Sequence, residues 1–127
     1  MEIILERDEI EKLVKKYFAN QGIKVNEVII DYDYDEDYYG HKNYKVIGVI
    51  KRYVVIDHET YFAQKEFDED GIQEIITDFF KLANVDIDKI NFEIIIPYDQ
   101  RDVLEIKAKL KLKEKVRGRN IENDTKY

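Results

Sequence analysis

Two amphipathic segments that lie 62 residues apart are the pattern that most constrains the fold of this chain. In each, apolar residues recur at offsets of three, four, seven and eight, which places them on one face of a helix. The first set is Ile10, Leu13, Val14, Tyr17 and Phe18, and the second is Ile72, Ile75, Ile76, Phe79 and Phe80. The sequence therefore predicts helices over residues 8–22 and 70–84, each with one buried face.

Boundary signals flank both segments. Asp8 with Glu11, and Asp70 with Gln73, have the spacing of a capping box. Gly22 suits the left-handed residue that often follows the end of a helix. A similar phrase follows each helix, "GIKVNEVII" and "NVDIDKINF". We infer a helix–strand–strand unit used twice, explained either by duplication or by the similar physics of any amphipathic helix followed by a strand.

Alternating apolar and polar residues predict the strands. After the first helix, Ile30, Tyr32 and Tyr34 alternate with Asp31, Asp33 and Asp35, so the two rows face opposite sides. Residues 44–56 are more continuously apolar, which predicts a central strand with both faces partly covered. Residues 59–67 predict a short polar edge strand, and residues 91–98 and 103–115 predict the last two. In the final strand, lysines occupy the outward positions: Lys107, Lys109, Lys111 and Lys113.

These elements predict a single α+β domain over residues 1–116. We expect two helices on one face of a mostly antiparallel sheet of four or five strands, in the order α-β-β-(β)-α-β-β. No proline- or serine-rich linker divides the 127 residues. Residues 117–127 lose all periodicity, so we expect this tail to be frayed or disordered.

Composition removes most catalytic chemistries. The chain has no cysteine and no serine, and its two histidines, His41 and His58, are predicted in turns. Thiol chemistry, cysteine-ligated metals and a serine triad are thereby excluded. No glycine-rich phosphate loop occurs. The "DYDYDED" segment lacks the glycine and glutamate that a calcium loop requires at its sixth and twelfth positions. We expect a protein that is not an enzyme and has no cofactor or metal.

The charge is negative and unevenly distributed. The net charge of −7 argues against a general nucleic-acid coat. Residues 105–119 sum to +5, however, so the rest of the chain sums to −12. The start of the sequence lacks signal-peptide order, and no apolar run approaches the roughly 20 residues that span a bilayer. We expect a cytoplasmic protein with no membrane association.

The segment "IIDYDYDEDYYGHK", residues 29–42, combines five acidic residues with four tyrosines. If its strand neighbours the lysine strand in one sheet, the two charged rows neutralise each other and have a structural role only. The other interpretation is a surface for a basic protein, because acidic side chains steer partners and exposed tyrosines are common at interfaces. The residues predicted to bind a partner are Asp33, Asp35, Glu36, Asp37, Tyr38 and Tyr39, with a second patch of Asp68, Glu69 and Asp70.

The leading functional hypothesis is a small acidic inhibitor or regulator that engages the basic groove of a nucleic-acid enzyme. In size, acidity and absence of a catalytic motif, the chain resembles phage-encoded DNA mimics, including anti-CRISPR proteins. An alternative is a nucleic-acid-binding protein that uses Lys107, Lys109, Lys111, Lys113, Arg117 and Arg119. A third is a structural or assembly subunit, including a homo-oligomer, that pairs through an exposed edge strand.

Overall fold

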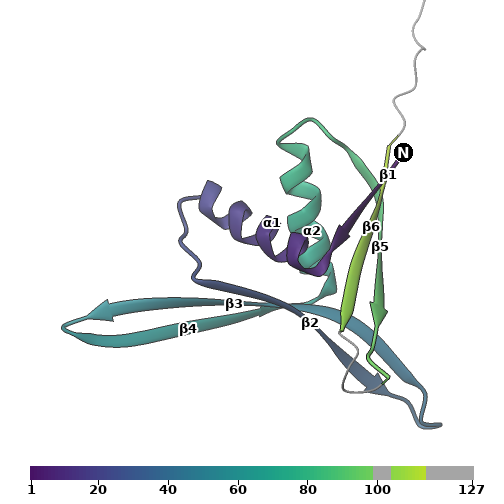
Figure 1. Ribbon diagram of the computed structural model, residues 1–127, viewed down its shortest axis with the longest axis horizontal. Helices are drawn as coiled ribbons and strands as arrows, with labels where there is room; N and C mark the ends of the chain where they lie inside the picture. The colour runs from purple at the N-terminus through teal and green to yellow at the C-terminus, as the bar shows by residue number, and fades with distance from the viewer. Residues whose placement is uncertain (99–103, 114–127) are drawn as a thin grey trace, which may run out of the picture.

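Two antiparallel three-stranded sheets enclose two helices in the computed structural model, which describes residues 1–98 and 104–113 (Figure 1). In chain order the elements are β1 (Glu2–Glu6), α1 (Arg7–Asn20), β2 (Glu27–Glu36), β3 (Lys42–Ile56), β4 (Glu59–Phe67), α2 (Glu69–Lys81), β5 (Ile87–Ile95) and β6 (Glu105–Leu112). One sheet has the order β1-β6-β5 and the other β2-β3-β4. The α+β class is confirmed.

The expectation of one sheet with four or five strands is wrong in two respects. The strands divide into two sheets, and β1 is a strand that the sequence did not predict. β1 has only five residues and runs directly into α1. It therefore offers too short an alternation to recognise. The alternation of apolar and polar residues indicates which face of a sheet a residue occupies, but not which strand lies beside it. The division of the strands into two sheets therefore cannot be recognised from the sequence of any one strand.

The N-cap of each helix lies two residues before the residue predicted from the capping-box spacing, Asp8 in α1 and Asp70 in α2. Glu6 is the N-cap of α1 and forms a capping box with Glu9, whereas Asp68 is the N-cap of α2 and accepts a hydrogen bond from the Gly71 N–H. The two N-caps are again 62 residues apart. The left-handed conformation of Gly22 is confirmed, with a φ of 77°.

The two halves of the chain exchange their first strands. β1 precedes α1 but pairs with β6, and β4 precedes α2 but pairs with β3. The registers correspond as well: one sheet aligns Leu5, Ala108 and Phe92 across its three strands, and the other aligns Phe67, Gly48 and Ile30. The repeated unit inferred from sequence is therefore present in the topology, extended by a leading strand.

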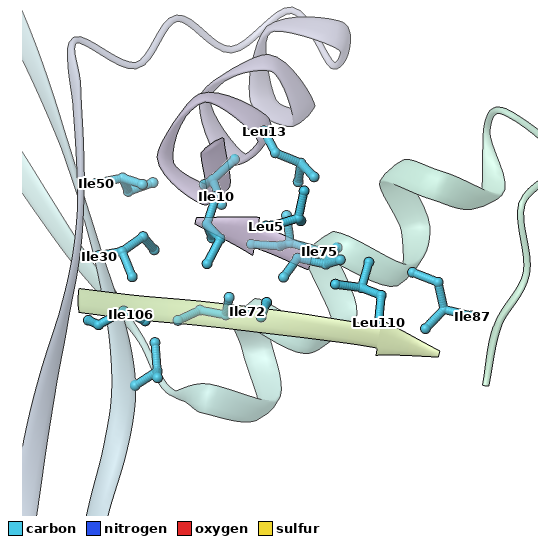
Figure 2. Packing of buried hydrophobic residues seen from close by; sticks show 14 of the residues in the cluster. Leu5, Ile10, Leu13, Ile30, Ile50, Ile72, Ile75, Ile87, Ile106 and Leu110 are labelled. Carbon is cyan, nitrogen blue, oxygen red and sulfur yellow. The ribbon is translucent and has the colours of Figure 1, made fainter. Parts of the chain in front are cut away.

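The core fills the angle between the sheets. Ile10 of α1 and Ile76 of α2 are fully buried. Figure 2 shows side chains from both sheets converging on the helices, with Ile30 from β2 and Ile106 from β6. Burying each such side chain contributes about 1.5–3 kcal/mol. The two sheets are thus held together mainly by packing against the helices rather than by direct contact with each other (Figure 2).

Two further predictions concern the C-terminal tail and membrane association. The predicted tail of residues 117–127 lies outside the described residues. Within residues 1–98 and 104–113, neither helix is long and apolar enough to cross a membrane.

Candidate protein-binding surface

The aspartates of β2 line the face of their sheet that points away from the helices. Ile30 is buried under the helices, and successive residues of a strand alternate between faces, so Asp31, Asp33 and Asp35 point outward. On the opposite face Tyr32 is half-buried, whereas Tyr34, two residues further along the strand, is 45% exposed. The acidic row is thus a feature of a strand that extends past the core.

Asp37 fixes the turn at the end of this hairpin. Its carboxylate accepts hydrogen bonds of 2.8 Å from the backbone N–H groups of Tyr39 and His41. The His41 ring atom Nδ1 also lies 3.2 Å from its second oxygen. These bonds, first that from the His41 N–H, lower the pKa of Asp37 below the ordinary aspartate value. Asp37 therefore shapes the turn as well as adding charge.

The fixed turn displays two tyrosines. Tyr38 is 93% exposed and Tyr39 is 80% exposed. Their rings meet edge to face, with centroids 5.4 Å apart. Large aromatic side chains on a rigid turn suit binding, because little side-chain entropy is lost when a partner covers them.

The two acidic patches predicted from sequence meet around one hollow. Asp33 and Asp35 of β2 line it together with Asp68 and Glu69, which lie where β4 ends and α2 begins. Its volume is about 210 Å³. Asp70 is exposed in the first turn of α2 and does not line the hollow. The fold thus joins residues that are more than 30 positions apart in sequence.

Sequence reasoning missed two charged members of this hollow, Lys45 and Glu66. Lys45 lies opposite Asp33 on β3, and its Nζ is 3.5 Å from an oxygen of Asp35. Both side chains of that pair are mostly exposed, and such pairs contribute about 0–1 kcal/mol. The ion pair therefore leaves the aspartates accessible.

Part of the second patch has a structural role. The Glu69 carboxylate accepts a 3.1 Å hydrogen bond from the Val46 N–H and so closes the edge of β3 that β4 has left. Asp68 caps α2 through the Gly71 N–H at 2.8 Å. These two carboxylates are held in place, whereas Asp33, Asp35 and Glu36 are exposed and form no ion pair with a buried group in the described residues.

The outward face of the sheet β2-β3-β4 carries a surplus of negative charge. Its paired positions hold five carboxylates and two lysines, namely Glu27, Asp31, Asp33, Asp35 and Glu66 with Lys45 and Lys51. Lys51 lies opposite Glu27, with 3.8 Å between charged atoms. The surplus is concentrated toward the Asp33 end, next to the hollow.

The lysine row belongs to the other sheet and is matched there. The outward face of β1-β6-β5 carries four lysines and four glutamates at paired positions, Lys89, Lys107, Lys109 and Lys111 with Glu2, Glu6, Glu93 and Glu105. Lys109 lies 3.7 Å from Glu93, and Lys107 lies 3.7 Å from Glu105. In the described residues, no ion pair joins the aspartates of β2 to the lysines of β6.

Of the three other basic residues predicted to bind nucleic acid, only Lys113 lies within the described residues. Lys113 follows β6 and is exposed. Arg117 and Arg119 lie outside the described residues.

β3, predicted as a central strand with both faces partly covered, is covered only in the part of the strand around residues 46–51. β3 is the central strand of its sheet, as expected, and Val46 and Ile50 are buried. Beyond Lys51, however, the strand leaves the core, and Val55 is 68% exposed. A run of apolar residues has the same sequence pattern whether helices or solvent cover it. The exposure of the outer half of β3 could therefore not be predicted from the sequence.

Groups of three or more potential metal ligands are absent from the part of the chain that the structure describes. Comparison with known proteins found no matching family model, curated protein or solved structure. The surface must therefore be interpreted from its own chemistry.

Proposed function

We propose that this chain is a non-catalytic binding protein whose acidic, tyrosine-bearing hairpin engages the basic surface of a partner. The partner class that fits best is a nucleic-acid enzyme, because a groove that accepts phosphates also accepts spaced carboxylates. In that role the protein acts as an inhibitor or regulator, in the manner of a DNA mimic.

The main support is the separation of charges between the two sheets. The lysines of β6 are matched by glutamates of their own sheet, so they leave the β2 carboxylates available. The convergence of Asp33 and Asp35 with Asp68 and Glu69 adds a compact negative site. Tyr38 and Tyr39, at the turn of the same hairpin, supply apolar contact area.

The same charge pattern disfavours direct nucleic-acid binding. A phosphate backbone approaching Lys107, Lys109 and Lys111 meets Glu2, Glu6 and Glu93 on the neighbouring strands. Affinity for phosphates comes mainly from cations that are free to replace counterions. A gel shift with duplex and single-stranded DNA at low salt is expected to show no retardation.

Affinity capture with matched variants tests the proposal. The full-length protein serves as bait for a lysate, and bound proteins are eluted with duplex DNA. We expect the eluate to contain basic nucleic-acid-binding proteins. The triple variant Asp33→Asn, Asp35→Asn, Glu36→Gln should lose them.

The control variant is Glu2→Gln, Glu93→Gln, Glu105→Gln, which removes the same number of charges from the other sheet. It should capture the same proteins as the wild type. Equal loss in both variants would indicate a net-charge effect and contradict a specific surface. Retention in both would place binding elsewhere, and an eluate without nucleic-acid-binding proteins would refute the proposed partner class.

A further inference from the structure

The outer half of the β3–β4 hairpin projects from the molecule as a two-stranded arm. β2 pairs with β3 only as far as Lys51, so residues 52–63, which we call the β3–β4 arm, have no third strand among the described residues. The arm is seen at the left of Figure 1. Its apolar side chains include Val55, 68% exposed, and Phe62, 70% exposed. An isolated two-stranded hairpin is at best marginally stable in water.

The two edges of the arm differ. On the β3 edge, the Tyr53 N–H donates a 2.8 Å hydrogen bond to Asn26 Oδ1, so this edge is closed where it leaves the sheet. On the β4 edge, the described residues supply no strand partner, because β4 pairs with β3 alone. Free edges of this kind accept a strand from another chain.

The sequence of β4 is complementary to itself in the antiparallel direction. When two copies of β4 are placed antiparallel about Phe62, Glu59 lies opposite Lys65 of the second copy. Because the pairing is symmetric, Lys65 of the first copy also lies opposite Glu59 of the second copy, so the charge pair occurs twice. The large Tyr61 lies opposite the small Ala63 of the second copy, so side chains also alternate in size.

We propose that two copies of this chain pair through their β4 edges, antiparallel and centred on Phe62. The result is a continuous six-stranded sheet in the order β2-β3-β4-β4-β3-β2 with a twofold axis at its centre. This proposal goes beyond the proposed function and does not depend on it.

Packing on the arm favours the same register. Phe62 already meets Tyr53 edge to face, with ring centroids 6.1 Å apart. Directly opposed residues on paired strands have Cβ atoms about 4.5–5.5 Å apart. The two Phe62 side chains therefore meet at the axis and join the two aromatic pairs into one strip across four strands.

The existing contacts of the charged residues are compatible with this pairing. Glu59 accepts a hydrogen bond of 2.9 Å from the Tyr61 hydroxyl, and the Lys65 ammonium lies 5.1 Å from the centre of the Phe67 ring. Both contacts are within one chain, and the Glu59 and Lys65 side chains are exposed. They orient the two side chains without excluding a charge partner from the second copy.

Solution mass over a concentration series, measured by light scattering on the full-length protein, tests the proposal. The wild type should change from monomer to dimer as concentration rises. Phe62→Lys places two ammonium groups together at the axis and should abolish the dimer. Val55→Lys is the matched control, because it adds the same charge at similar exposure on β3, away from the β4 edge, and should leave the dimer intact.

A charge exchange tests the register without relying on Phe62. Glu59→Lys and Lys65→Glu each create like-charge pairs and should weaken dimerisation about tenfold. The double variant restores opposite charges and should recover the wild-type affinity. A wild type that stays monomeric at every concentration, a dimer that Val55→Lys disrupts as strongly as Phe62→Lys, or a double variant no better than the singles would overturn the proposal.

Discussion

Asp37 shows how one side chain sets both the shape and the charge of the candidate surface. Its carboxylate receives two backbone hydrogen bonds that hold Tyr38 and Tyr39 outward. Because these bonds favour the ionised form, the pKa in the folded protein is lowered from the ordinary value of about 3.9. The stabilisation is therefore present above that value and is lost as the pH falls through the lowered pKa.

A pH titration followed by NMR checks this prediction. The Asp37 carboxyl signal should titrate with a pKa below the ordinary aspartate value of about 3.9. The amide protons of Tyr39 and His41 should lose protection over the same pH range. An Asp37→Ala variant should show those amides unprotected at neutral pH. Titration at or above the ordinary value would show that the turn does not rest on this carboxylate.

At the scale of elements, α2 packs closely against a glycine on the strand beneath it. A Cβ atom added to Gly48 of β3 would lie 3.3 Å from Ile72 Cδ1 on α2 and 3.4 Å from Ile30 Cδ1. The corresponding position of the other sheet is Ala108 of β6, which is fully buried. The central strand of each sheet therefore has a small residue at the corresponding position.

Substitution at Gly48 should produce a graded loss of stability. Gly48→Val overpacks this contact and should lower the free energy of unfolding by about 1–3 kcal/mol. Gly48→Ala should cost less, because the neighbouring atoms are the ends of isoleucine side chains that can shift. Urea denaturation measures both. Equal stability of wild type and Gly48→Val would show that α2 does not rest on β3 at this point.

Elements also mark the boundary of what the sequence could predict. The buried faces of both helices follow from the 3.6-residue period, a local property, and Ile10 and Ile72 are indeed buried. The pairing of strands is a non-local property. The local sequence pattern therefore could not predict that Asp33 and Lys109 lie in different sheets. The exposed run that ends at Ile56 was misread for the same reason, since only the folded chain shows that the helices stop short of it.

The whole molecule is held together by the exchange of first strands between its halves. Because β1 completes the sheet of β5 and β6, and β4 completes the sheet of β2 and β3, neither half has its full sheet alone. We therefore predict a single cooperative unfolding transition. Far-ultraviolet circular dichroism and tyrosine fluorescence should give coincident urea curves. Two separated transitions would show that the halves fold independently.

The exchange also separates the charges, because the acidic hairpin belongs to one sheet and the lysine row to the other. The result is an exposed negative surface at Asp33, Asp35 and Glu36, which the lysines of β6 leave unmatched. At the molecular scale, we expect cationic partners to prefer this side of the protein.

NMR titration of the isotope-labelled protein with an octapeptide of lysine and arginine, at physiological ionic strength, shows whether this surface attracts cations. We expect amide shift changes concentrated in residues 31–41 and around Asp68 and Glu69. The outward face of β1-β6-β5 should be almost unaffected. Shift changes spread evenly over both sheets, or centred on the glutamates beside Lys107 and Lys109, would contradict this expectation.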